Sequence, residues 1–256
     1  MVGAPQTQTI SAPTFELLKC ISVNNFDYQI SQLLPGDYFI VDVDDTLIAT
    51  QAMMFRPHSP FYEFIDKLKK QSPKNVADII STWRLNRKSI LVEPEWPEIL
   101  NKLRNKGITV LALTQVNTGS FGKIASVEKW RATELNQMQL NFSPYAVHEI
   151  ETIIEHNEPA TLFQGILFTG THSKAAVLEA FISKYQRPTK VMFFDDRLHQ
   201  VENIFEFCKT ANISYNGYHY LGAAQLPYKP EMDLGAIQTQ MILNQEWAED
   251  DQIQKN

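Results

Sequence analysis

Short runs of consecutive apolar residues recur along the chain and alternate with segments of helical spacing. The first run, Tyr38–Val41, is followed by runs at 108–113, 163–169, 191–194 and 213–221. Unbroken apolar runs of this length are typical of strands buried on both faces, as in a parallel sheet covered by helices. The intervening segments predict helices over 98–106, 124–140, 175–185 and 197–210. This order favours an α/β fold with a doubly wound parallel sheet.

The alternation is interrupted between residues 48 and 97. Apolar residues at positions 61, 64, 65 and 68 have helical spacing, and five prolines interrupt the segment. We therefore expect a small, mainly helical cap insertion at 51–96, within a core formed by 35–50 plus 97–230. Residues 1–34 are predicted to be a loose leader (1–13) followed by one or two surface helices. Residues 141–162 are predicted to be a second, irregular excursion, and 231–256 a C-terminal tail whose last stretch, 246–256, is expected to fray.

Composition narrows the class of protein. The 256 residues are 44% hydrophobic and 20% charged, with a net charge of −6, which suits one globular domain with an insertion. The acidic balance argues against a nucleic-acid partner. No apolar run is long enough to form a transmembrane segment, and the N-terminus lacks the features of a Sec signal peptide. Cys20 and Cys208 form no disulfide framework. We expect a cytoplasmic protein, or one exported without a Sec signal peptide.

Three acidic residues follow the first apolar run. Asp42 and Asp44 are two positions apart, so on an ideal strand both side chains point to the same side, and Asp45 comes next. Carboxylates concentrated at a strand's end are costly unless a cation offsets them, and Mg²⁺ with oxygen ligands is the usual one. The alternative is a strand followed by an acidic turn, in which an aspartate caps a helix.

Reactive side chains also follow other predicted strands. Thr114 ends the second run and Asp195-Asp196 ends the fourth, while Lys174 lies in the first turn of a predicted helix. A cation is unfavourable at that end of a helix, which indicates that Lys174 holds an anion. The alternatives are a helix-capping threonine and an exposed lysine. Because carboxyl ends of parallel strands meet at one edge, we expect these residues to converge with Asp42 and Asp44.

Other chemistries are open or disfavoured. Basic residues in the insertion form either an anion-attracting lid or a solvated helix face; they are Lys67, Lys69, Lys70, Arg84, Arg87 and Lys88. A cysteine-based phosphatase loop would need arginine at positions 26 or 214, which are Phe26 and Ser214. No P-loop motif is present. His172 and His199 are candidates to line the site, although surface positions are the default for histidine.

The four motifs in this order resemble those of the haloacid dehalogenase (HAD) superfamily of phosphatases, over about residues 36–222. They are Asp42-Val43-Asp44-Asp45-Thr46-Leu47, Leu111-Ala112-Leu113-Thr114, Lys174 and Asp195-Asp196. The chain also resembles a little-characterised acid-phosphatase-like branch found in some intracellular bacteria. That resemblance rests on Trp130-Arg131, Phe168-Thr169 and Gly217-Tyr218-His219-Tyr220. Gln115-Val116 departs from many relatives, which carry Asn or Arg there.

The resemblance implies a HAD-like Rossmannoid fold and a Mg²⁺-dependent phosphatase. Asp42 would attack phosphorus to form an aspartyl-phosphate, and Asp44 would protonate the leaving oxygen and then activate water. The resemblance implies Mg²⁺ ligands from Asp42, the backbone carbonyl of Asp44, Asp195 and Asp196. Thr114 and Lys174 would balance charge on the phosphoryl oxygens. The alternatives are phosphotransfer to an acceptor other than water, phosphonate hydrolysis, or a non-catalytic Mg²⁺-binding interaction module.

The substrate is predicted from the size and composition of the insertion. Small caps leave an open crevice, which suits a phosphate presented on a larger molecule. Aromatic residues are frequent in the insertion, and one or two at its mouth would stack on an aryl leaving group. We expect an aryl phosphate such as phosphotyrosine, with a phosphoprotein as the possible partner, over a nucleotide or sugar phosphate. The sequence gives no indication of oligomeric state.

Overall fold

An eight-stranded sheet forms the centre of the molecule in the computed structural model, which describes residues 12–71, 74–229 and 232–254. The strands, in their order across the sheet, are β1 (Phe15–Cys20), β10 (Ser214–Tyr220), β9 (Lys190–Asp195), β2 (Tyr38–Val41), β5 (Thr109–Thr114), β8 (Ile166–Phe168), β7 (Ala160–Phe163) and β6 (Glu151–Ile154). Neighbours from β1 to β8 are parallel, and β7 and β6 add an antiparallel hairpin. The predicted α/β fold with a mostly parallel sheet is confirmed.

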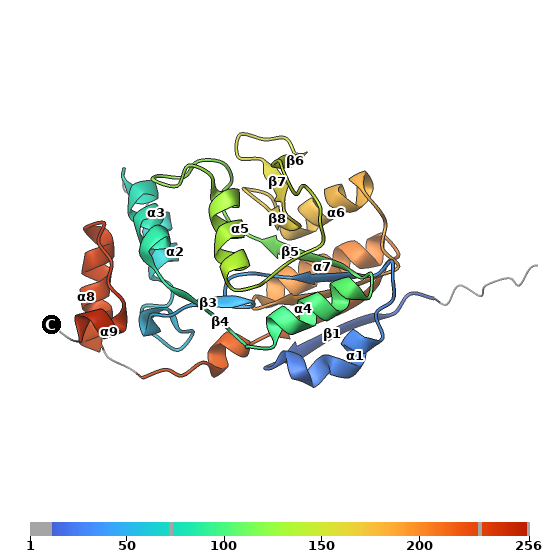
Figure 1. The fold of residues 1–256 in the computed structure, drawn as a ribbon, viewed down its shortest axis with the longest axis horizontal. Helices are drawn as coiled ribbons and strands as arrows, with labels where there is room; N and C mark the ends of the chain where they lie inside the picture. The colour runs from blue at the N-terminus through green and yellow to red at the C-terminus, as the bar shows by residue number, and fades with distance from the viewer. Residues whose placement is uncertain (1–11, 72–73, 230–231, 255–256) are drawn as a thin grey trace, which may run out of the picture.

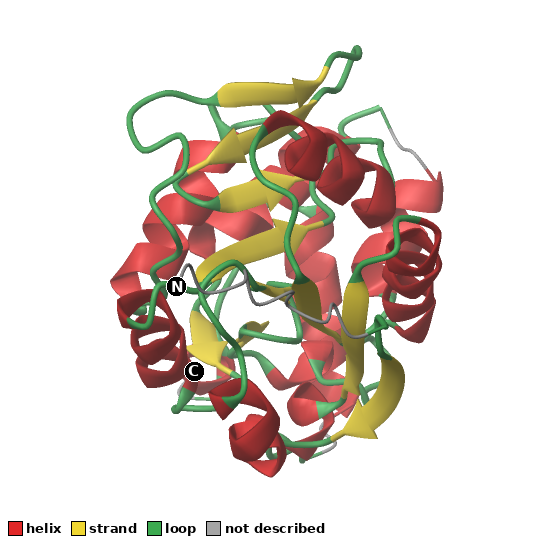
Figure 2. Ribbon diagram, turned by 90° about the vertical axis from the view of Figure 1, so that its right-hand side faces the viewer, coloured by secondary structure: helices red, strands yellow, loops and turns green. Residues whose placement is uncertain are grey.

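Helices cover both faces of this sheet, which explains why the strands show no polar alternation. In β2, Phe39 and Val41 join one hydrophobic cluster, whereas Tyr38 and Ile40 join the other. Figures 1 and 2 show helices on both sides of the strands. The first cluster includes residues of α1 (Asp27–Ser31), α4 (Trp96–Asn105) and α5 (Val127–Gln137). The second includes residues of α6 (Lys174–Lys184) and α7 (Leu198–Thr210).

The chain order places a ligand crevice beside β2. From β2 the chain proceeds to β5 and β8 on one side, and then returns to β9 and β10 on the other side. In open α/β sheets, the loops at such a reversal diverge at the carboxyl ends of the strands and leave a crevice between them. The segments that follow β2, β5 and β9 therefore face a common space.

The insertion leaves the core through a two-stranded stem. β3 (Ile48–Thr50) pairs antiparallel with β4 (Ser89–Leu91), and the chain between them forms η2 (Met53–Phe55), α2 (Phe64–Gln71) and α3 (Val76–Asn86). Helices are thus present within the cap expected at 51–96, and the two strands of its stem occupy 48–50 and 89–91. Thr50 lies opposite Ser89 in this stem, and the antiparallel pairing provides hydrogen-bond partners for backbone groups of both strands.

Two further segments differ from the sequence-based expectation. Phe15–Cys20, which is expected to belong to surface helices, instead forms β1. The open edge of β10 offers it backbone partners: Tyr215 and Leu221 donate to the carbonyls of Thr14 and Cys20, each at 2.8 Å. The short helices η1 (Val23–Phe26) and α1 follow it. The 141–162 excursion is not wholly irregular, because β6 and β7 extend the sheet. The expected loose leader lies almost entirely outside the described residues.

The C-terminal segment packs on the cap. Its helices, α8 (Met232–Leu243) and α9 (Asp250–Ile253), follow η3 (Gly222–Gln225) and lie beside α2 and α3 in Figure 1. Ile242 is fully buried in the same cluster as Trp83, and Glu249 is only 1% exposed. The prediction that the last stretch frays is therefore wrong for residues 246–254, and the tail as a whole contributes to the core of the cap.

Candidate active site

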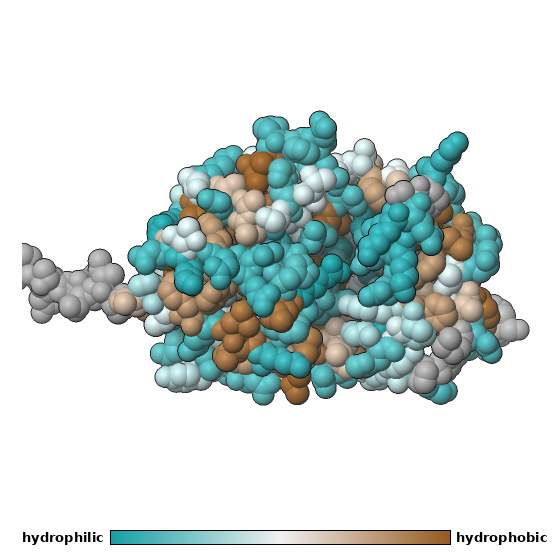
Figure 3. All heavy atoms as spheres, turned by 180° about the vertical axis from the view of Figure 1, so that it is seen from behind, coloured by the Kyte–Doolittle hydropathy of each residue, from teal (hydrophilic) through white to brown (hydrophobic). Residues whose placement is uncertain are grey.

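The six residues singled out at the strand ends line one cavity of about 320 Å³ between the core and the cap; they are Asp42, Asp44, Thr114, Lys174, Asp195 and Asp196. Asp42 follows β2, Thr114 ends β5 and Asp195 ends β9. Seen from behind, the surface is hollowed between the core and the cap, and hydrophilic residues border the hollow (Figure 3). The expected convergence is confirmed, including for residues more than 150 positions apart in the chain.

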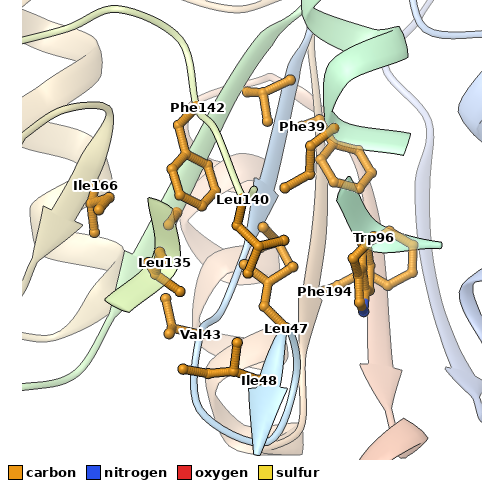
Figure 4. Close-up of a cluster of buried hydrophobic side chains, with 14 of the residues drawn as sticks. Phe39, Val43, Leu47, Ile48, Trp96, Leu135, Leu140, Phe142, Ile166 and Phe194 are labelled. Carbon is orange, nitrogen blue, oxygen red and sulfur yellow. The ribbon is translucent and has the colours of Figure 1, made fainter. Parts of the chain in front are cut away.

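Apolar side chains anchor the loop after β2 in the hydrophobic core. Val43, Leu47 and Ile48 are fully buried in the core, where Figure 4 shows them near Leu135 and Leu140. The Val43 carbonyl accepts hydrogen bonds from the backbone N–H groups of Leu47 and Ile48, both at 3.0 Å. The intervening acidic side chains are thereby turned towards the cavity. The alternation of apolar and acidic residues in this motif thus serves both anchoring and presentation.

Asp45 is the residue of this loop with a left-handed backbone conformation. Its φ of +59° lies in the left-handed region, which aspartate tolerates better than bulkier residues. Its carboxylate accepts a hydrogen bond from the Tyr62 hydroxyl at 2.8 Å, and this contact joins the loop to the cap. Burial raises the pKa of Asp45 to about 6, although the bond from Tyr62 opposes the rise. Asp45 therefore links the two parts of the protein around the cavity.

Lys174 lies between two carboxylates at the bottom of the site. It begins α6, whose N-cap Ser173 accepts a hydrogen bond from the Ala176 backbone N–H. Its ammonium group donates to Asp42 and to Asp195, the latter at 2.6 Å, and the residue is only 2% exposed. An exposed lysine, the alternative left open by the sequence, is thus wrong. Burial lowers the pKa of Lys174, but the two carboxylates outweigh this and raise it.

The acids around Lys174 outnumber it. Asp42, Asp195 and Asp196 each offer an oxygen, and these oxygens lie within 4.8 Å of one another. Three carboxylates with one ammonium group leave a charge of −2 when all are ionised. Burial and the nearby Asp195 raise the pKa of Asp42, although the positive charge of Lys174 lowers it. Burial and the neighbouring carboxylates likewise raise the pKa of Asp196. This donor set fits a hard divalent cation such as Mg²⁺.

Asp44 has a different environment. Arg131 donates to its carboxylate at 2.8 Å, and Arg87 lies 3.5 Å away from the other oxygen. Burial alone would raise its pKa, but the guanidinium groups of Arg131, Arg87 and Arg84 lower it to about 2. Its carboxylate lies outside the group of three acids, so the metal contact implied by the resemblance is limited to its backbone carbonyl.

Glu134 completes an ionic network with these arginines. It accepts from Arg131 at 2.7 Å and from Arg87 at 3.2 Å. Arg84 and Arg87 belong to the basic cluster in the cap, and their burial shows that the solvated-face alternative is wrong for these two. Lys67 and Lys70 of the same cluster are exposed. Arg84 comes four positions after the apolar Ile80, and that helical spacing was the available sign that it lies on a buried face.

Other residues raised by the sequence are more peripheral. Gln115 lines the cavity and accepts a hydrogen bond from Gln200 at 2.9 Å. His172 packs against His156 with ring centroids 5.2 Å apart, and neither His172 nor His199 is among the described residues that line this cavity. Thr114 is 1% exposed and faces the cavity from β5. The alternative of a capping threonine is not needed, since Ser126 caps α5, the next helix.

The comparisons with known proteins give a family without an assigned activity. The family model described as a protein of unknown function, DUF2608, matches residues 21–254. "Uncharacterized protein RP296" of Rickettsia prowazekii is 28% identical over 88% of this chain and 86% of its own length. "Uncharacterized protein RT0286" of Rickettsia typhi is 26% identical over 73% of this chain and 69% of its own length.

No solved structure matches the chain. These comparisons do not name the haloacid dehalogenase superfamily, so that resemblance stays a prediction based on the four motifs. Within the described residues, no helix has both the length and the apolar character needed to cross a membrane.

Proposed function

The chain belongs to the DUF2608 family of proteins of unknown function, and we propose that it is a Mg²⁺-dependent phosphomonoester hydrolase of the haloacid dehalogenase type. The observation that carries this proposal is the pairing of buried Lys174 with Asp42 and Asp195, within a group of three carboxylates whose oxygens lie within 4.8 Å of one another. A site that holds both a fixed cation and an excess of carboxylates suits an anionic phosphoryl group together with a divalent metal, which those carboxylates would hold.

Asp42 is the proposed nucleophile. Its carboxylate attacks phosphorus, an O–P bond forms to give an aspartyl-phosphate, and the bond to the leaving oxygen breaks. Asp42, Asp195 and Asp196 would hold the Mg²⁺, with the backbone carbonyl of Asp44. The bound ion would supply charge neutralisation for the phosphoryl oxygens. Lys174, which donates to Asp42, orients that carboxylate and favours its ionised form against the effect of burial.

Asp44 is the proposed proton carrier. A pKa of about 2 means that it is ionised in the free site, which suits the second half-reaction, where it takes a proton from water. In the first half-reaction it must donate a proton to the leaving oxygen. An incoming phosphoryl group competes for the guanidinium groups of Arg131 and Arg87, and so raises the pKa of Asp44 when the proton is needed.

The leaving group is proposed to be an aryl oxide, such as that of phosphotyrosine. Three aromatic residues of the cap line the cavity, namely Phe55, Tyr62 and Trp83. A volume of about 320 Å³ suits a small molecule or a single modified side chain. The same volume suits a nucleotide or sugar phosphate, which is the second candidate class. A non-catalytic Mg²⁺-binding module is the candidate from another class, and the dense ionic site itself is what favours it.

Release of inorganic phosphate tests the proposal. The protein is incubated with p-nitrophenyl phosphate, a phosphotyrosine peptide, a phosphoserine peptide, a nucleoside monophosphate and a hexose phosphate, with Mg²⁺ or with EDTA. We expect turnover that requires Mg²⁺ and is fastest with the aryl phosphates. Activity undiminished by EDTA contradicts the metal mechanism. A tenfold advantage for a nucleotide or hexose phosphate, about 1.4 kcal/mol, contradicts the aryl preference only. Mg²⁺ binding without any turnover favours the non-catalytic module.

A further inference from the structure

Arg84 of α3 is a buried cation that forms no salt bridge in the described part of the chain. Its exposed fraction is 8%, and its hydrogen bond to Asn117 is a long one, 3.4 Å from the guanidinium Nη1 to Oδ1. Among the residues that the structure describes, no carboxylate forms a salt bridge with it. Arg87 and Arg131 instead share the carboxylates of Asp44 and Glu134. Three guanidinium groups thus lie near two carboxylates, and Arg84, which acts on Asp44 only at longer range, is the one of the three without a salt bridge to either carboxylate.

Aromatic rings hold this guanidinium group without neutralising it. Its central carbon lies 5.0 Å from the ring centroid of Phe121 and 5.8 Å from that of Trp130. Such contacts compensate only in part for the removal of a cation from water. Burial and the like charge of Arg131 lower the pKa of Arg84 to about 10, so the group is still charged at neutral pH. A bound anion would compensate for the loss of water around the guanidinium group and for the repulsion between Arg84 and Arg131.

The position of Arg84 connects two cavities. A second cavity of about 240 Å³ shares Lys69, Arg84 and Gln115 with the main one. Its walls are otherwise largely apolar, with Val76, Ile80, Val116 and Phe121 among the lining residues. The second space therefore adjoins the main cavity at Arg84, and a leaving group that extends from the phosphoryl site towards Arg84 would reach it. Arg84 belongs to the cap, whereas the phosphoryl site belongs to the core.

We propose that the substrate carries a second anionic group, a carboxylate or a phosphate, on its leaving group, and that Arg84 binds it. This inference rests on the proposed hydrolase function and names the substrate class within it. A guanidinium group offers a planar pair of N–H donors that matches a carboxylate or a phosphate with two parallel hydrogen bonds. In this arrangement Lys174, in the core, recognises the transferred phosphoryl group, and Arg84, in the cap, recognises the second anionic group.

Matched substrate pairs test this assignment. Each pair differs by the second anion: phenyl phosphate with 4-carboxyphenyl phosphate, glycerol 3-phosphate with 3-phosphoglycerate, and fructose 6-phosphate with fructose 1,6-bisphosphate. The first two pairs report on a carboxylate and the third on a phosphate. For the wild-type protein with Mg²⁺ we expect kcat/KM to be at least about tenfold higher for the doubly anionic member of at least one pair. Ratios below tenfold in all three pairs overturn the inference.

Two variants identify the residue that causes the preference. In Arg84→Gln the ratio within the preferred pair is expected to fall to about 1 or 2, while Arg84→Lys, which keeps the charge, retains part of it. Lys70→Gln on the exposed side of α2 removes one positive charge from the same cap and is the matched control, with an unchanged ratio. Because a ratio is compared, a general loss of activity does not imitate the result. A wild-type ratio that persists in Arg84→Gln contradicts the assignment.

A binding measurement separates this inference from the hydrolase proposal. Phosphonoacetate carries a phosphonate and a carboxylate and is not a phosphomonoester, and methylphosphonate lacks the carboxylate. Calorimetric titration with Mg²⁺ is expected to give at least about tenfold tighter binding of phosphonoacetate, lost in Arg84→Gln. Equal binding of the two probes by the wild type counts against the second-anion site. If no substrate is turned over but this difference is found, the hydrolase proposal fails and the anion site stands.

Discussion

The carboxylate of Glu249 accepts a hydrogen bond from the backbone N–H of Lys88 at 2.7 Å, although the residues are 161 positions apart in the chain. Lys88 precedes the strand through which the cap returns to the core, and Glu249 precedes α9. The same carboxylate oxygen accepts from the Trp247 indole at 2.8 Å. The C-terminal segment therefore closes the cap from the outside and holds one strand of its stem.

Replacement of Glu249 by alanine is expected to destabilise the protein. The change leaves the Lys88 N–H and the Trp247 indole N–H without their acceptor at a partly buried site, and such a loss costs about 1–3 kcal/mol. Urea unfolding followed by circular dichroism measures the effect. Glu246→Ala, at an exposed position in the same segment, is the matched control and should differ little from the wild type. Equal stability of the two variants would show that the tail does not hold the stem.

Asp42→Asn tests the nucleophile. The amide keeps the shape of the side chain but loses the attacking charge and one metal ligand, so we expect kcat for p-nitrophenyl phosphate to fall by ~10³-fold or more. Asp27→Asn on the exposed helix α1 is the control, with wild-type kinetics expected. Residual activity within about tenfold of the wild type would exclude Asp42 as the nucleophile.

Lys174→Ala tests the buried ammonium group. The change removes the partner of Asp42 and Asp195 and the charge that faces the phosphoryl oxygens. We expect kcat/KM to fall by ~10²-fold or more. Lys184→Ala, near the end of the same helix, is the control, because its ion pair with Glu151 is largely in solvent. If both variants behave alike, Lys174 has no role in the chemistry.

The two thiols are expected to be inert in the folded protein. Cys20 is 5% exposed and Cys208 is fully buried, and burial, with Glu93 adding to it for Cys20, raises the pKa of each to about 12. An unfolded thiol ionises near pH ~8.5. The folded pKa is raised, so the contribution to stability is complete below about pH 8.5 and decreases as the pH rises towards 12.

Labelling with a disulfide reagent at pH 8 measures thiol access. Native protein should react slowly at both positions, at a rate set by opening of the structure, whereas protein in urea should react at once. Immediate reaction of one thiol in the native sample would mean that its burial is wrong. A fall in the urea midpoint between pH 8 and pH 10 would support the direction given above.

The central sheet and its six site residues could be predicted because each depends on local pattern and on a general rule. The run at Tyr38–Val41 is apolar since both faces are covered, and the ends of parallel strands meet at one edge. Asp42 and Thr114 could therefore be brought together without any knowledge of their contacts. The convergence of strand ends does not predict which side chains form hydrogen bonds or ion pairs with these residues.

The rest depends on contacts between distant segments. Arg87 and Arg131 become buried only because Glu134 and Asp44 lie between them, and nothing local distinguishes Arg87 from the exposed Lys70. The strand β1 forms because β10 presents an open edge to it. Such pairings are decided by the tertiary structure rather than by spacing along the chain.

Asp44→Asn tests the proton carrier, and the leaving group decides the result. An asparagine is nearly isosteric but cannot donate the proton that a poor leaving group needs, whereas p-nitrophenolate leaves without one. We expect kcat/KM to fall at least about tenfold more for an alkyl phosphate than for p-nitrophenyl phosphate. Glu134→Gln removes the other carboxylate of the same arginine pair, and because Glu134 carries no proton to the substrate, any loss should be equal for the two substrates. Equal losses in Asp44→Asn would instead assign Asp44 to the ionic network alone, since a carboxylate that only orients Arg131 affects both substrates alike.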